Sequence, residues 1–303
     1  MRPIIQELQH QASRILLDKD QEFLLALTCV LAQGHLLIED QPGVGKTTLV
    51  QMMSKLLGLQ YSRIQFTNDL LPADILGNSI FDPKANSFQF HAGPLFAQLV
   101  LADELNRASP RTQSALLQSM EEGNVTIDGT THNLPQPFII MATQNPLSQV
   151  GTSPLPESQL DRFHMSLEMH FASPQAEAKI IQGHDARSKI KTLPTVIHLP
   201  ELLKIQSDIQ QVHIADSIAN YISQLLHKSR DSEKYKPLSI RAGIALAGCA
   251  KAYAWIKNRD HVWPEDVQAV APYVFAHRLG GLQSVTKGQA GARELLAEVA
   301  LPR

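Results

Sequence analysis

The run Gln41-Pro42-Gly43-Val44-Gly45-Lys46-Thr47-Thr48 decides the fold of this chain, and only Asp40 separates it from the apolar stretch His35-Leu36-Leu37-Ile38-Glu39. This pattern predicts a buried strand, a glycine-rich loop and a helix that begins at the lysine. Backbone N–H groups of such a loop point inward at a helix N-terminus, where they can hold a phosphate chain. We therefore expect Lys46 to reach the β- and γ-phosphates of a nucleotide and Thr47 to bind Mg²⁺. The other residues expected to line the phosphates are Pro42, Gly43, Val44, Gly45 and Thr48.

Asp40 is the main departure from the phosphate-loop pattern, which has glycine six residues before the lysine. Aspartate tolerates turn geometry better than most residues, so the loop can still form. Its carboxylate must point away from the phosphates, because it would otherwise repel them.

Two later segments carry the polar residues that a nucleotide site needs. The apolar run Leu99-Val100-Leu101-Ala102 ends in Asp103 and Glu104, and a further apolar run at 138–143 leads to Asn145. In P-loop ATPases the first acid holds Mg²⁺ and the second polarises the attacking water. We expect Asn145 to orient that water. Arg162 follows the third strand of this set, where it is badly placed for its own nucleotide and well placed for a neighbour's.

The chain resembles the MoxR-type AAA+ ATPases, which belong to the clade with a helix-2 insertion that also includes magnesium-chelatase motors. Segments matching the family occur in family order along most of the chain. They are Gln65-Phe66-Thr67, Asp69-Leu70-Leu71-Pro72-Ala73-Asp74-Ile75, Phe90-His91-Ala92-Gly93-Pro94-Leu95, Asp103-Glu104-Leu105-Asn106-Arg107-Ala108, Thr112-Gln113-Ser114-Ala115-Leu116-Leu117, Met120-Glu121-Glu122-Gly123, Ala142-Thr143-Gln144-Asn145-Pro146 and Leu155-Pro156-Glu157-Ser158-Gln159-Leu160-Asp161-Arg162-Phe163.

The alternation of strands and helices predicts an α/β core with a parallel sheet, and the resemblance implies five strands in the order 5-1-4-3-2. We expect these strands near 35–39, 61–65, 98–102, 138–143 and 165–170. Two inserted β-hairpins are expected at 77–93 and 125–134, and in relatives such hairpins face the axis of a ring. The predicted domains are an AAA+ nucleotide-binding core at 1–172 and an all-α lid at 173–303. The resemblance implies that Arg241, at the start of a lid helix, reads the γ-phosphate.

Composition narrows the choice of function and compartment. With 303 residues, of which 44% are hydrophobic and 18% charged, the chain is an ordinary soluble one, and its apolar runs are too short to span a membrane. The net charge of −2 argues against a dedicated nucleic-acid binder. No signal peptide is evident at the N-terminus. The twelve histidines show no metal-ligand spacing, and we expect His35 at a surface or boundary position. Cys29 and Cys249 read as buried thiols, which favours the cytoplasm.

The favoured function is a Mg-dependent ATPase that works as a homo-oligomer, in relatives a hexameric ring, and remodels a partner protein. The resemblance adds a partner with a von Willebrand factor A domain and a role in maturation or metal insertion. Two alternatives stay open: a nucleic-acid motor, and a nucleotide-dependent scaffold in which Asp40 has reduced turnover. The hairpin at 125–134 contains no Lys or Arg, which disfavours the first.

Overall fold

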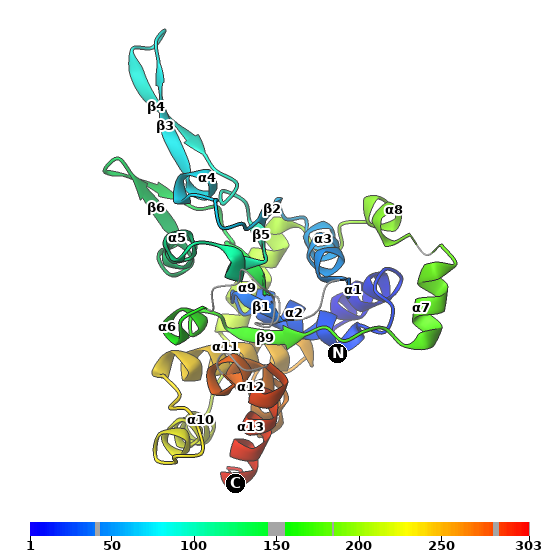
Figure 1. Ribbon diagram of the computed structural model, residues 1–303. Coiled ribbons are helices and arrows are strands. Elements are labelled where there is room, and N and C mark those ends of the chain that lie inside the picture. Colours follow the sequence, from blue (N-terminus) through cyan, green and yellow to red (C-terminus); the bar gives the residue numbers. More distant parts are fainter. Residues whose placement is uncertain (40–42, 145–154, 184, 281–284, 303) are drawn as a thin grey trace.

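A five-stranded parallel sheet forms the centre of the protein (Figure 1). The computed structural model describes residues 1–39, 43–144, 155–183, 185–280 and 285–302. The strands of the sheet are β1 (Leu36–Glu39), β2 (Tyr61–Gln65), β5 (Leu99–Asp103), β8 (Ile139–Gln144) and β9 (Met165–Glu168). They lie in the order β2-β5-β8-β1-β9, which confirms the predicted order 5-1-4-3-2 when it is read from the β9 edge.

The central strands are apolar up to their carboxyl ends because both faces of the sheet are covered. Alternate residues of β5 enter different apolar clusters: Leu101 packs on one face and Val100 on the other. The first face is covered by α1 (Pro3–Ser13), α2 (Asp20–Leu31) and α3 (Lys46–Leu56), together with C-terminal helices. The second is covered mainly by α5 (Pro110–Glu122).

Short helices link these elements, namely α4 (Pro72–Leu76), the 3-10 turn η1 (Leu105–Arg107) and α6 (Glu157–Leu160).

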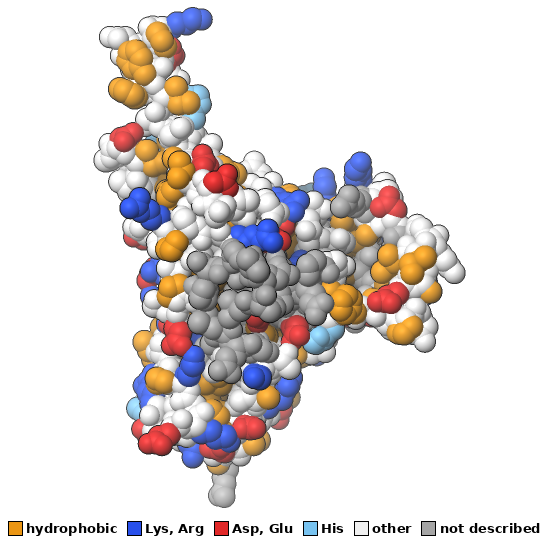
Figure 2. Space-filling model, in the orientation of Figure 1, with side chains coloured by type: hydrophobic (Ala, Val, Ile, Leu, Met, Phe, Trp, Pro, Cys, Tyr) orange, Lys and Arg blue, Asp and Glu red, His pale blue; other side chains and the backbone are white. Residues whose placement is uncertain are grey.

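Both predicted β-hairpins are present, and they project from the same side of the core (Figure 1). The first pairs β3 (Gly77–Asp82) with β4 (Ser87–Ala92), and the second pairs β6 (Asn124–Ile127) with β7 (Thr130–Asn133). Their bases are linked by a stack of Phe90 on His132, with ring centroids 3.9 Å apart. Figure 2 shows hydrophobic side chains along the longer hairpin, where Ile80, Phe81 and Phe88 are exposed.

The described residues of the C-terminal part form helices and connecting segments, as predicted, apart from an isolated β-bridge between His213 and His261. Its helices are α7 (Pro174–Ile181), α8 (Ala186–Lys191), α9 (Leu199–Gln210), α10 (Asp216–Arg230), α11 (Ile240–Ile256), α12 (Pro264–Leu279) and α13 (Val285–Glu298). Ser239 caps α11, since its hydroxyl accepts a 3.0 Å hydrogen bond from the Ala242 N–H. Both cysteines are buried free thiols. None of the helices in the described part is both long and apolar enough to cross a bilayer.

The N-terminal helices pack directly against the C-terminal ones. Helix α2 contacts α9 and α11, and the Gln206 amide donates a 2.9 Å hydrogen bond to the Val30 carbonyl. One apolar cluster therefore contains residues from both predicted domains. The division at residue 172 falls between β9 and α7 and stays a prediction.

Candidate functional site

The glycine loop leads into α3 at its lysine, as the sequence predicts. Gly43 and Gly45 have φ values of 92° and 97°, a region that side-chain-bearing residues rarely adopt. Gly45 is the N-cap of α3, so the helix begins at Lys46, which is buried, and continues with the half-buried Thr47 and Thr48. A helix N-terminus of this kind directs its first N–H groups towards a bound anion. Asp40, Gln41 and Pro42 lie outside the described residues.

The acidic pair lies at the carboxyl edge of the same sheet. The Thr143 hydroxyl donates to Asp103 Oδ1 at 2.7 Å and accepts the Glu104 N–H at 2.8 Å. The last residue of β5 is therefore tied to the neighbouring strand β8. The sequence analysis assigned no role to Thr143, although a hydroxyl near the end of a strand beside an acidic strand end is a usable signal.

Both acids are paired with arginines in this state. Arg63 on β2 approaches Asp103 Oδ2 with Nη2 at 2.7 Å and Nε at 3.2 Å. Glu104 forms an ion pair with Arg107 at 3.1 Å and has a left-handed φ of 57°. Such a backbone costs about 1–2 kcal/mol for a residue with a side chain. That strain at Glu104 is typical of a functional position. Asn145 follows the end of β8 and lies outside the described residues.

The two predicted arginines meet at a shared carboxylate. Arg162 Nη1 donates to the Leu117 carbonyl at 2.5 Å and pairs with Glu121 Oε2 at 2.9 Å. Arg241 Nη2 pairs with Glu121 Oε1 at 2.5 Å. One arginine follows α6 and the other begins α11, so Glu121 joins the core to the helical part. The sequence analysis did not single out Glu121.

These arginines lie at the edge of the sheet opposite the glycine loop. Strand β9 runs parallel to β1 with Met165 beside Leu36, and the His164 N–H donates to the His35 carbonyl at 2.8 Å. Arg162 thus precedes the amino ends of these strands, whereas the loop follows the carboxyl end of β1. The length of β1 alone, at about 3.3 Å per residue, separates Arg162 from the glycine loop by about 10 Å along the strand direction. Figure 1 shows α6 on one flank and α3 with α8 on the other.

A second arginine–acid group holds the segment that precedes β9 against the C-terminal helices. Arg278 on α12 donates from Nε to Asp161 Oδ1 at 2.6 Å, and the Ser239 hydroxyl donates to Asp161 Oδ2 at 2.8 Å. Asp161 precedes Arg162 directly. The helical part is therefore anchored one residue away from the first predicted arginine, and that anchor restricts where Arg162 can point.

Comparisons with known proteins match this architecture. Residues 35–165 match the family described as "ATPase family associated with various cellular activities (AAA)", and residues 235–298 match the AAA lid domain. The chain is 35% identical to Chaperone MoxR1 of Mycobacterium tuberculosis, over 89% of this chain and 74% of that protein. The chain belongs to the MoxR-type AAA+ ATPases.

Further relatives extend the match over the full length. An uncharacterized protein of Bacillus subtilis, YeaC, is 41% identical over 100% of this chain and 96% of that protein. A crystal structure from Cytophaga hutchinsonii, assigned as an ATPase, superposes with a TM-score of 0.88 at 32% identity, covering 99% and 95% of the two chains. The MoxR-type protein described here is accordingly an ATP hydrolase.

The residues that would hold Mg²⁺ in this MoxR-type ATPase fit that ion. Thr47 offers a hydroxyl at the start of α3 and Asp103 a carboxylate at a neighbouring strand end, and Mg²⁺ prefers such oxygen ligands. Across the described residues, no group of three or more His, Cys, Asp and Glu side chains could hold a metal by itself. The ion would therefore be bound together with the nucleotide phosphates.

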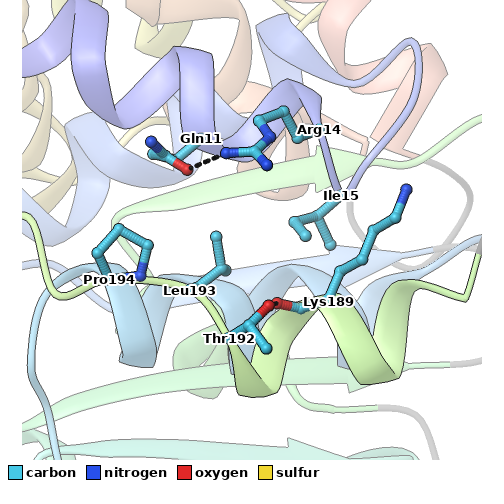
Figure 3. Close-up of a pocket in the computed structure, with 7 residues that line it drawn as sticks. All are labelled: Gln11, Arg14, Ile15, Lys189, Thr192, Leu193 and Pro194. Carbon is cyan, nitrogen blue, oxygen red and sulfur yellow. Dashed lines mark hydrogen bonds between the residues drawn. The ribbon is translucent and has the colours of Figure 1, made fainter.

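Two hollows lie on the side of the protein that carries α3, and one of them reaches the start of that helix. A cavity of about 350 Å³ lies between α1 and the α8 region, where Arg14 Nη1 donates to Gln11 Oε1 at 3.1 Å (Figure 3). Ile15 lines this cavity. The next residue, Leu16, packs near the loop, since a Cβ atom placed on Gly45 would lie 3.2 Å from Leu16 Cδ2. A larger hollow of about 840 Å³ runs from Thr47 along α3 towards Arg63.

The expectation that His35 lies at a surface or boundary position is wrong. Its Nδ1 accepts the Ile140 N–H at 3.1 Å and its Nε2 lies 3.2 Å from the Met120 carbonyl, which leaves Nε2 as the donor. Burial lowers the pKa of His35 to about 4 and that of His164 to about 3. Both imidazoles are thus neutral, and His35 fastens the end of α5 to the sheet one residue before Glu121.

Proposed function

We propose that this protein is a ring-forming, Mg-dependent ATPase that uses hydrolysis to remodel a partner protein complex. The observation that carries the proposal is the convergence of Arg162 and Arg241 on Glu121, at the sheet edge opposite their own glycine loop. Arginines in that position complete a site only when a second copy brings its nucleotide to them. The exposed Ile240 and Ile244 beside Arg241 give that face an apolar area for a second copy to cover.

The proposed roles follow the chemistry of each group. Lys46 and the loop N–H groups bind the phosphates, and Asp103 with Thr47 holds the Mg²⁺ that neutralises developing charge on the phosphoryl oxygens. Glu104 polarises the attacking water, and Asn145 orients it. Arg162 and Arg241 stabilise the charge on the nucleotide of the neighbouring protomer.

We place the client-contacting surface on the two hairpins, of which β3–β4 carries exposed aromatic and aliphatic side chains. Ile80, Phe81 and Phe88 are exposed, and Phe81 packs edge-to-face on Phe88 with centroids 5.3 Å apart. Such a surface suits an apolar polypeptide. As the resemblance implies, a protein with a von Willebrand factor A domain would act with it, and the buried free thiols fit a cytoplasmic location.

Mixing two inactive variants tests the shared site. We expect Arg162→Ala and Lys46→Ala proteins each to lack turnover and to regain part of it together, because mixed rings pair an intact loop with an intact arginine. A mixture of Lys46→Ala with Glu104→Gln is the control and should stay inactive, since every protomer then has a defective nucleotide site. Phosphate release is the readout, and no recovery in the first mixture would contradict the proposal.

A second experiment separates the protein-remodelling function from the nucleic-acid alternative. Glu104→Gln protein loaded with ATP should not shift labelled single-stranded DNA or RNA at either low or moderate salt. A shift that weakens steeply with salt would favour a nucleic-acid motor instead. Wild-type protein that binds ATP but releases no phosphate at any concentration would favour the scaffold.

A further inference from the structure

Glu121 divides its carboxylate between two cations from different parts of the chain. Oε2 pairs with Arg162 at 2.9 Å and Oε1 with Arg241 at 2.5 Å, so neither oxygen is shared. Two guanidinium groups this close repel each other, and an anion between them offsets that repulsion. Among the described side chains, only Glu121 bridges Arg162 and Arg241.

The carboxylate is itself held in place. The last turn of α5 is closed by Gly123, which has a φ of 64° and donates its N–H to the Ser119 carbonyl at 3.0 Å. The His35 ring contacts the Met120 carbonyl at 3.2 Å. Glu121 therefore projects from a fixed helix end, and it restricts side chains that otherwise have many rotamers.

The Arg162 guanidinium is not fully satisfied by its contacts in this state. Arg162 Nε is buried and has no hydrogen-bond partner. Together with Arg278 and Asp161, the group contains three arginines against two acids, which leaves one positive charge in excess. A group with excess positive charge and unused donors suits an anion brought in from outside.

We propose that Glu121 is a positioning residue for ATP hydrolysis at the neighbouring protomer. It keeps Arg162 and Arg241 side by side, so that both guanidinium groups meet the γ-phosphate of that protomer together. This inference rests on the proposed shared site. A misplacement of about 1 Å in such a group can cost about 100-fold in rate.

The test compares Glu121→Gln with Glu122→Gln. Glu122 is the next residue, is exposed, and accepts a 2.9 Å hydrogen bond from Gln118 on its own helix, which makes it a matched control. We expect Glu121→Gln to lower kcat about 10- to 100-fold with KM for ATP within about twofold of wild type. Glu122→Gln should retain wild-type values of both. Unchanged or faster turnover in Glu121→Gln would overturn the proposal.

Mixing experiments assign Glu121 to a side of the interface. Glu121→Gln should regain activity with Lys46→Ala, which supplies an intact arginine face, and should gain nothing with Arg162→Ala, which is defective on the same face. The reverse pattern would overturn the proposal. If Lys46→Ala and Arg162→Ala fail to rescue each other, the shared site itself is wrong; if they succeed while Glu121→Gln keeps its kcat, only the role of Glu121 is wrong.

A second variant covers the case in which Glu121→Gln does not fold. Glu121→Asp retains the charge but is one methylene shorter, so it can reach one arginine and not both. We expect it to have a thermal midpoint near wild type and a kcat between those of wild type and Glu121→Gln. Wild-type kcat in Glu121→Asp would show that bridging both arginines is unnecessary.

Discussion

Replacing Arg278 by methionine should destabilise the protein more than the loss of any ordinary surface ion pair. The Arg278 side chain is 6% exposed and that of Asp161 is 19% exposed, so the pair lies largely away from solvent. Besides its ion pair, Arg278 Nη2 donates to the Asp161 carbonyl at 2.9 Å and to the Phe163 carbonyl at 2.8 Å. Methionine fills similar space but satisfies none of these acceptors.

The magnitude follows from what the substitution leaves behind. Removing one partner of a buried ion pair costs about 3–5 kcal/mol, because the other charge stays uncompensated. Asp161 keeps its hydrogen bond from Ser239 and some solvent contact, so we expect the lower end, about 3 kcal/mol. With an unfolding entropy of about 2.1 cal/mol/K per residue, this lowers the thermal midpoint by about 5 °C if the chain unfolds as one unit.

Circular dichroism of the nucleotide-free protein measures that shift, and Lys236→Met is the control. Lys236 pairs with Glu157 across the same boundary, but the two side chains are 43% and 66% exposed. Such a pair contributes about 0–1 kcal/mol. Arg278→Lys should recover less than half of the lost thermal midpoint, because a lysine ammonium cannot reproduce the planar set of N–H donors of a guanidinium. Equal midpoint shifts for Arg278→Met and Lys236→Met would refute the reasoning.

Three other predictions concern the nucleotide site and the buried histidines. Lys46→Ala should abolish ATP binding in calorimetry, because the phosphate charge loses its buried ammonium. Glu104→Gln should bind ATP but release no phosphate, since the amide cannot act as a base. The low folded-state pKa values of His35 and His164 mean that the unfolded chain binds more protons below pH 6.5, so stability is lost as pH falls from 6.5 towards 4. Each histidine should contribute about 2 kcal/mol of that loss by pH 5, and His164→Asn should flatten the thermal midpoint's pH dependence.

Local sequence patterns predicted the elements of the fold well because their causes are local. The central strands of the sheet are short apolar runs, and the Asp128-Gly129 turn has positive φ at both residues, as an Asp-Gly pair favours. Ser239 caps α11, and a serine directly before a helix is a local signal of this kind. Gly43 and Gly45 supply the conformations that the loop requires. Such features need no information about distant residues.

The missed features depend on distant parts of the chain meeting. Glu121 and Arg241 are 120 residues apart, and no local sequence pattern predicts that the end of α5 lies against the start of α11. His35 was misjudged because a lone histidine at the start of a strand reads as a boundary residue, whereas its ring is enclosed by α5 and β8. Arg63 became a partner of Asp103 only through the pairing of β2 with β5. The predicted roles of Asp40 and Asn145 remain predictions.

The position of Glu121 links a hairpin to the surface that carries Arg162 and Arg241, which we call the arginine face. Helix α5 ends at Glu122, Gly123 closes its last turn, and β6 begins at Asn124. The Leu134 N–H donates to the Gly123 carbonyl at 3.0 Å, so both strands of this hairpin are fixed to the helix end. A neighbour's nucleotide that contacts Arg162 and Arg241, and shifts Glu121 together with them, would therefore act on the base of the hairpin. Because the arginine face and the loop face differ, copies would associate head to tail, and each hydrolysis event would reach the hairpin of the protomer that supplies the arginines.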